Sequence, residues 1–167
     1  MLLNLVDPNL LVSDAKDNCP YKGSTLGFVR NLSIKARGAV YENIVQSIME
    51  SKNCSVTKSP TPDYDRVIDG KRVEIKGATL CKSSGYTKFI FNQIRPDYEY
   101  DTLLFAMFYP EKIVFAEMPK QQVKLLCTTG VFKKQHGGKR DSTTTYTYTD
   151  RDWETAEYRT RSQVESD

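Results

Sequence analysis

The sequence predicts an α/β (α+β) domain with a central mixed β-sheet flanked by helices. Two observations predict this class: an amphipathic helical pattern over 34–50, and a following series of short strand-like segments interrupted by one more helix. A chain of 167 residues with 39% hydrophobic content can bury a core without disulfides or metals. Since no repeat or linker divides the chain, we expect residues 1–167 to form a single domain.

The helical pattern over 34–50 is the strongest local signal. Two neighbouring columns of apolar residues recur every four positions and form one broad stripe: Val40, Ile44, Ile48 and Tyr41, Val45, Met49. Glu42 falls just outside the edge of this stripe, where a carboxylate can reach the boundary between core and solvent.

Strands are expected at 54–58, 88–94, 102–108, 113–118 and 143–149. The 102–108 segment is almost entirely apolar, as in a strand covered on both faces. Pro119 can open a second helix that runs through Leu126. The first 30 or so residues are expected to form short helical turns or an arm.

Composition excludes several classes of site. Cys19, Cys54, Cys81 and Cys127 are widely spread without a CxxC pair, and His136 is the one histidine, so a Cys/His zinc site lacks ligands. No secretory signal and no apolar run of about 20 residues is present. We therefore expect free thiols in an intracellular, cytoplasmic protein that does not enter a membrane. With a net charge of only +3, a nucleic-acid surface must be local.

The segment 65–76, DRVIDGKRVEIK, reads as a tight hairpin. Asp69-Gly70 is a favoured pair for a two-residue type I′ turn. That turn sets Ile68 opposite Lys71, Val67 opposite Arg72, Arg66 opposite Val73 and Asp65 opposite Glu74. Val73 and Ile75 then point into the core.

In this register Asp65, Glu74 and Lys76 share the other face of the hairpin. Two opposed carboxylates repel unless a cation lies between them. Carboxylates bind Mg²⁺, which stabilises charge at a phosphate under attack, and a lysine can orient or deprotonate the attacking water. A solvated sheet face with an ordinary Glu/Lys pair is the alternative.

The hairpin resembles the signature of the PD-(D/E)xK nuclease superfamily, in which an acidic residue precedes an ExK strand. Pro62-Asp63-Tyr64-Asp65 and Glu74-Ile75-Lys76 carry the resemblance, together with the helical segment 37–42, RGAVYE. It covers about residues 36–118 and implies a restriction-endonuclease-like core. Asp63 follows the proline as in the motif, but the hairpin register favours Asp65, which we choose.

The resemblance implies a metal-dependent DNA endonuclease with Mg²⁺, for which Mn²⁺ can substitute. We expect metal ligands at Asp65, Glu74, Glu42 and the backbone carbonyl of Ile75, with Lys76 and Gln93 completing the catalytic set. DNA contacts are expected from cations and one histidine, most of them in the segment 130–150, which we interpret as an addition to the core: Arg37, Lys133, Lys134, His136, Lys139 and Arg140.

Cleavage of double-stranded DNA by a type II restriction-like homodimer is the expected activity, because two strands require two sites. A Holliday-junction resolvase or repair nickase of the same fold is the first alternative. A non-catalytic DNA-binding module is the second, and it predicts that Lys76→Ala leaves function intact.

Overall fold

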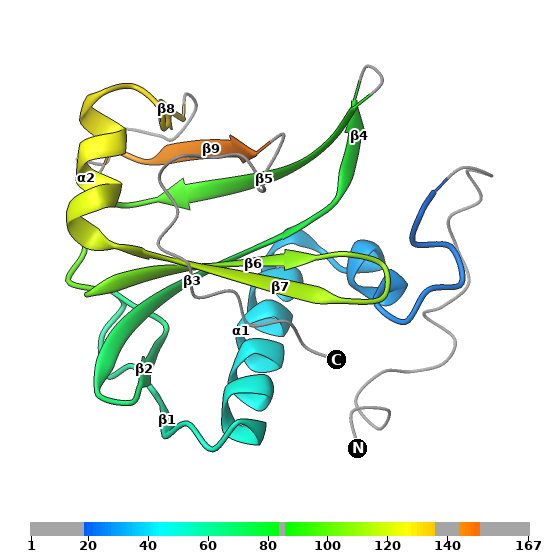
Figure 1. Ribbon diagram of the computed structural model, residues 1–167, viewed down its shortest axis with the longest axis horizontal. Coiled ribbons are helices and arrows are strands. Elements are labelled where there is room, and N and C mark those ends of the chain that lie inside the picture. Colours follow the sequence, from blue (N-terminus) through cyan, green and yellow to red (C-terminus); the bar gives the residue numbers. More distant parts are fainter. Residues whose placement is uncertain (1–18, 84–85, 136–143, 151–167) are drawn as a thin grey trace.

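The computed structural model describes residues 19–83, 86–135 and 144–150 (Figure 1). The described part holds two α-helices, α1 (Ile34–Ser51) and α2 (Lys120–Thr128), and a 3-10 helix at Gly27–Asn31. Its strands are β1 (Val56–Lys58), β2 (Arg66–Ile68), β3 (Lys71–Thr79), β4 (Cys81–Ser83), β5 (Tyr86–Ile94), β6 (Thr102–Phe108), β7 (Ile113–Pro119), β8 (Lys133–Lys134) and β9 (Tyr146–Asp150). No helix in these ranges is both long and apolar enough to span a membrane.

A five-stranded mixed sheet forms the centre of the fold, in the order β1-β2-β3-β6-β7. β3 and β6 pair in parallel, and the other neighbours pair antiparallel. The predicted central mixed sheet is therefore confirmed. Because parallel neighbours need a crossover connection, the chain leaves the sheet after β3 and returns at β6, and this crossover contains β4 and β5.

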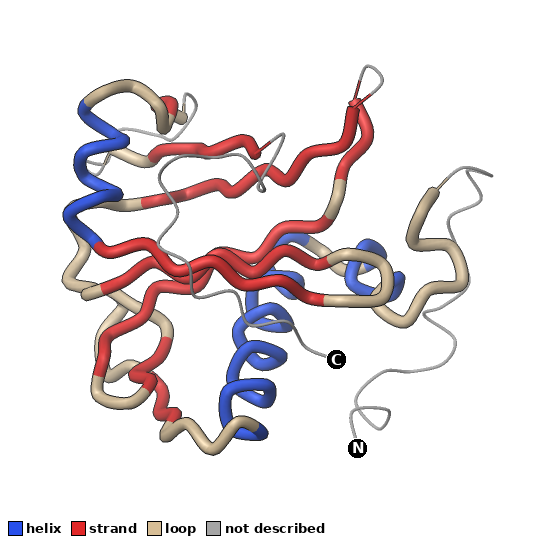
Figure 2. Tube along the Cα trace, in the orientation of Figure 1, coloured by secondary structure: helices blue, strands red, loops and turns tan. Residues whose placement is uncertain are grey.

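The strands β4 and β5 belong to a second, four-stranded sheet in the order β4-β5-β9-β8. In Figures 1 and 2 this sheet and α2 lie on one side of the central sheet, and α1 lies on the other. The sequence predicted helices on both sides. This is confirmed, since α1 covers one face and α2 lies on the other, where the second sheet also packs.

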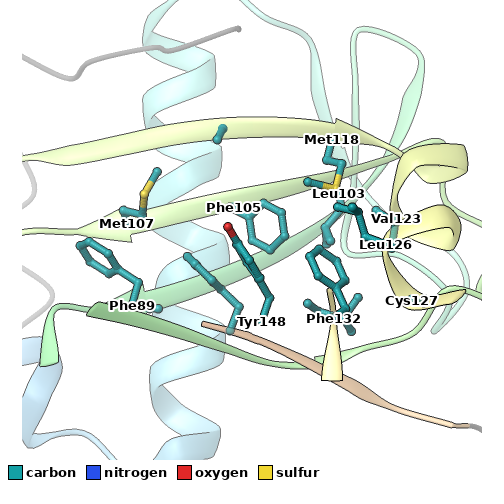
Figure 3. Packing of buried hydrophobic residues seen from close by; sticks show 14 of the residues in the cluster. Phe89, Leu103, Phe105, Met107, Met118, Val123, Leu126, Cys127, Phe132 and Tyr148 are labelled. Carbon is teal, nitrogen blue, oxygen red and sulfur yellow. The ribbon is translucent and has the colours of Figure 1, made fainter. Parts of the chain in front are cut away.

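The central strand β6 is buried along its whole length, as its apolar sequence predicted. Its side chains alternate between two cores, as the pleat of a strand requires. Leu104, Ala106 and Phe108 pack with the residues of α1. Leu103, Phe105 and Met107 pack toward the second sheet and α2 (Figure 3).

Ser33 is the N-cap of α1, and its side-chain oxygen accepts a hydrogen bond from the N–H of Ala36 at 3.3 Å. The predicted apolar stripe is confirmed: Tyr41, Ile44, Val45 and Met49 are buried, and Val40 and Ile48 are partly buried against the same core.

The predicted strand over 143–149 corresponds to β9, although residue 143 lies outside the described residues. Tyr148 packs its ring against Phe132, with ring centroids 4.8 Å apart. Tyr148 therefore belongs to the core between the two sheets. The second predicted helix, from Pro119, is also confirmed, with Pro119 as the N-cap of α2.

Candidate active site

The hairpin β2–β3 has the predicted register. Ile68 pairs with Lys71, Val67 with Arg72 and Arg66 with Val73. The two turn residues have positive φ, 48° at Asp69 and 80° at Gly70, as a type I′ turn requires. The Asp69 carboxylate also accepts a hydrogen bond from the N–H of Ser55 at 2.8 Å, which ties the turn to the chain before β1.

Asp65 lies one residue before the first paired residue of β2, so the predicted ladder pair of Asp65 with Glu74 does not form. Its N–H donates to the carbonyl of Val73 at 3.0 Å, and its carboxylate Oδ2 accepts from the N–H of Ile75 at 2.7 Å. The Asp65 carboxylate thus accepts the hydrogen bond from Ile75 that a backbone carbonyl of a neighbouring strand would otherwise accept. This position fixes the carboxylate beside Glu74, although the ladder has already ended.

Glu74 is a buried carboxylate, only 5% exposed. Lys76, two residues along the same face of β3, places its Nζ 2.6 Å from Glu74 Oε1. Burial, and then the charge and hydrogen bonding of Asp65, raise the pKa of Glu74 to about 7, while Lys76 acts against that rise. The structure therefore brings the three predicted residues Asp65, Glu74 and Lys76 together.

Glu42 projects from α1 toward the same region. Its Oε2 accepts a hydrogen bond from Nη1 of Arg66 at 3.0 Å. Burial raises the pKa of Glu42, as does the nearby charge of Asp65, and Arg66 opposes the rise. Glu42, Asp65 and Arg66 line a pocket of about 390 Å³ between α1 and the segment leading into β2, which is completed by Ala39, Asn43, Lys58, Ser59, Thr61, Pro62 and Tyr64.

The donor set of this site fits a magnesium ion that keeps part of its water shell. Among the described residues, no three His, Cys, Asp or Glu side chains are arranged to hold a metal by themselves. Asp65 and Glu74 supply two neighbouring carboxylates. The C=O and N–H of one strand residue leave the same edge, so the Ile75 carbonyl points toward the edge where its N–H meets Asp65. Mg²⁺ commonly binds one or two carboxylates and several waters.

The other predicted site residues lie apart from this trio or outside the described residues. Gln93 is exposed near the end of β5, has a positive φ of 57°, and donates its N–H to Oε1 of Gln135 at 3.0 Å. Lys133 and Lys134 are exposed on β8. His136, Lys139 and Arg140 fall outside the described residues. Asp63 does not line the pocket.

Arg37, predicted to contact DNA, has an internal structural role. Its Nη2 donates to the carbonyls of Arg30 and Leu32 at 3.0 and 3.2 Å, at the end of the 3-10 helix that precedes α1. These bonds hold the approach to α1, and DNA contact by the same group stays a prediction.

No protein-family model matches the chain, and no curated protein matches it. Among solved structures, the chain is similar to the bacterial homing endonuclease I-Ssp6803I. The identity is 16%, the TM-score is 0.42, and the match covers 55% of this chain and 72% of that one.

Arg66 is the residue of this site that the sequence analysis missed. Its side chain is only 5% exposed and makes four hydrogen bonds, three of them to α1. The signal was present in the hairpin register. Arg66 stands opposite Val73, whose side chain was predicted to point into the core, and an arginine on a core-facing position requires buried partners.

Proposed function

We propose that this chain is a divalent-metal-dependent DNA endonuclease whose catalytic residues are Asp65, Glu74 and Lys76. One observation carries the proposal: Asp65 is fixed at the edge of β3 by Ile75, immediately beside a buried Glu74 whose carboxylate contacts Lys76 at 2.6 Å. Two acids and an amine at one strand edge form a suitable set for hydrolysing a phosphodiester.

Asp65, Glu74 and the Ile75 carbonyl would hold Mg²⁺ or Mn²⁺ at this edge. When bound, the ion would stabilise charge on the phosphate and lower the pKa of a coordinated water. A carboxylate as buried as Glu74 needs a compensating cation, which Lys76 provides in the structure. With the ion bound, Lys76 would donate from Nζ to the attacking water and orient it.

Glu42 as a third metal ligand stays a prediction. Its carboxylate already accepts a hydrogen bond from Arg66 at 3.0 Å, so a contact with the ion would run most easily through a water. Gln93 likewise stays a predicted neighbour of the site.

Double-stranded DNA is the substrate that we propose, cut by a restriction-type homodimer. The resemblance of the segment 62–76 to the PD-(D/E)xK signature supports this assignment. So does the pair of exposed lysines on β8, which could bind DNA phosphates sequence-independently. Two copies related by a two-fold axis would present one site to each strand.

The deciding experiment incubates the protein with supercoiled plasmid and with a defined four-way junction, in Mg²⁺, in Mn²⁺ and in chelator. We expect plasmid cleavage with either ion, none in chelator, and at least about a hundredfold loss in Lys76→Ala. Lys71→Ala is the matched control. Lys71 is exposed on the same strand, and its Nζ lies 3.9 Å from Oε1 of Glu117, which is not part of the proposed site.

The outcomes separate the candidate functions. Cleavage of the junction alone would replace the restriction-type activity by a resolvase. A Lys76→Ala variant that kept full activity, or cleavage that persisted in chelator, would refute the proposed site.

A further inference from the structure

Arg66 joins the strand that precedes the site to the helix beneath it. Its Nε donates to Oε1 of Gln46 at 2.9 Å, its Nη1 to Oε2 of Glu42 at 3.0 Å, and its Nη2 to Oδ1 of Asn43 at 3.2 Å. These three acceptors come from adjoining turns of α1, at positions 42, 43 and 46. The Arg66 guanidinium therefore hydrogen-bonds three polar side chains of α1 at once.

The fourth hydrogen bond of Arg66 reaches the site itself. Nη1 also donates to the backbone carbonyl of Asp65 at 2.8 Å. The other polar groups of Asp65 are held as well, its N–H by Val73 and its carboxylate by Ile75. Arg66 thereby contributes one of the contacts that fix the carboxylate at the edge of β3.

Burial excludes a direct role for Arg66 on the substrate. The Arg66 side chain is only 5% exposed, so its guanidinium cannot reach a DNA phosphate without a rearrangement of the fold. A buried cation is costly unless it is paired and hydrogen-bonded, and Glu42 provides the opposite charge here. Several bonds from one planar group also give fixed geometry, which a lysine cannot reproduce.

We propose that Arg66 is a positioning residue that sets the Asp65 carboxylate for metal binding, and that Glu42 contributes to the site through Arg66. This inference rests on the proposed metal-dependent function. The geometry gives these residues different roles. Asp65 and Glu74 would bind the ion, whereas Arg66 holds the Asp65 backbone and is itself anchored on Glu42, Asn43 and Gln46.

The sign of one effect distinguishes positioning from simple electrostatics. Arg66→Met removes a positive charge near a cation site, so electrostatics alone would strengthen Mn²⁺ binding. Positioning predicts the opposite, a loss of about tenfold or more, because partners behind a metal ligand affect affinity on that scale. Arg66→Lys, which keeps the charge but not the geometry, should lose affinity too.

The experiment is titration calorimetry with Mn²⁺ alone, on the full chain and without DNA. Asp65→Asn serves as the reference for loss of a ligand. Glu42→Gln keeps an oxygen that can accept from Arg66, so we expect it to lose no more than about threefold in affinity, the size of a weakened hydrogen bond. A loss as large as that of Asp65→Asn would make Glu42 a direct ligand and overturn its assigned role.

A milder pair of variants covers the case in which Arg66→Met does not fold. Gln46→Ala removes one acceptor of Arg66 without changing any charge, and we expect about a threefold loss of Mn²⁺ affinity. Ser47→Ala, at the exposed neighbouring position on α1, is the matched control and should bind as the wild type does.

The inference would be overturned if folded Arg66→Met bound Mn²⁺ as tightly as the wild type or more tightly. The same holds if both Arg66→Lys and Gln46→Ala did so. Either result would leave the proposed metal site itself intact. A wild-type chain that binds no Mn²⁺ would overturn the proposed function and this inference together. A fall in thermal stability without a fall in affinity would show that Arg66 is only structural.

Discussion

The Asp65 carboxylate accepts a hydrogen bond from the backbone N–H of Ile75 at 2.7 Å. This contact places an acidic side chain at the edge of β3, where β2 no longer supplies a ladder partner. An asparagine could keep the same hydrogen bond through its side-chain carbonyl, but it could not supply a charged oxygen to a metal ion. The contact therefore allows the role of the charge to be tested apart from the fold.

We expect Asp65→Asn to fold with an unfolding midpoint close to that of the wild type and to lose metal-dependent DNA cleavage by at least about a hundredfold. Asp63→Asn is the matched control, since it changes the neighbouring acid and the choice between these two was open from the sequence. The measurement is single-turnover cleavage of a plasmid in Mg²⁺. Loss of cleavage in Asp63→Asn and not in Asp65→Asn would assign the ligand to Asp63.

The raised pKa of Glu74 gives a second prediction, for pH dependence. Burial raises this pKa from 4.5 to about 7. Because a metal ligand must be deprotonated, binding of Mg²⁺ should release a proton and weaken by up to about tenfold per pH unit below that pKa. Calorimetry at several pH values checks this.

The same shift sets the stability of the metal-free protein. A carboxyl whose pKa is raised on folding favours the folded state most below its unfolded pKa of 4.5, and this contribution is lost as the pH rises through about 7. Glu74→Gln should remove that dependence from the thermal midpoint. A wild-type midpoint that rises through this range relative to Glu74→Gln would contradict the prediction.

Local patterns predicted much of this fold because their physical cause is local. The apolar stripe of α1 follows from helical periodicity, and the register of β2 with β3 follows from the positive φ that Asp69 and Gly70 can adopt. These features need no knowledge of distant segments.

The parts that were missed depend on distant contacts. The parallel pairing of β3 with β6 and the second sheet join segments far apart in the chain, and no turn specifies them. Asp65 leaves the ladder because Ser59, Val73 and Ile75 hold it elsewhere. Arg66 could have been found from its register opposite Val73, but its three acceptors on α1 could not have been named.

Gly77 gives a third prediction, because it lies directly against Tyr41. A Cβ at this position would lie 2.2 Å from Cδ2 of the Tyr41 ring. Since that ring is buried against Phe108, it has little room to move. Gly77→Ala should therefore lower the free energy of unfolding by about 1–3 kcal/mol, as overpacking does.

Gly38 on α1 is the matched control. A Cβ there would meet nothing within 4 Å, so Gly38→Ala should raise the free energy of unfolding by up to about 1 kcal/mol through helix propensity. Urea denaturation measures both. Equal effects of the two substitutions would show that the Tyr41 contact is not tight.

Arg72 and Asp101 give a fourth prediction, for behaviour in acid. The Asp101 carboxylate accepts hydrogen bonds from Nη2 of Arg72 at 2.6 Å and from its backbone N–H at 2.8 Å. The pKa of Asp101 falls from 3.8 to about 2, mainly because of the hydrogen bond from the Arg72 side chain and then the one from its backbone; the charge of Arg72 contributes less. The pair joins the start of β3 to the residue before β6.

A depressed carboxyl pKa stabilises the fold above its unfolded value and loses that effect as the pH falls toward the folded one. Wild-type stability should therefore drop between pH 3.8 and about 2 more steeply than that of Asp101→Asn. Because the pair is exposed, added salt should reduce the difference. Parallel acid titrations followed by circular dichroism would show whether the two curves differ.

The lysines of β8 give a last prediction, for DNA binding. Lys133 and Lys134 are exposed, and the next residue, Gln135, accepts a hydrogen bond from the backbone of Gln93 at the end of β5. This bond adds to the pairing of β8 with β9 in the second sheet, and Figure 1 places β8 near α2, at the end where β5 finishes. If the chain is a DNA nuclease as proposed, we expect both cations to contact the phosphates of bound DNA.

Each phosphate contact contributes about one unit to the slope of log affinity against log salt. Lys133→Gln and Lys134→Gln should each lower that slope by about one unit and weaken binding for all DNA sequences alike. Lys112→Gln, in the turn between β6 and β7, removes the same charge at a distance and should leave the slope unchanged. All three substitutions are made in the Lys76→Ala background, so that the DNA is not cleaved during the titrations. A slope equal in all three variants would mean that β8 does not lie against the DNA.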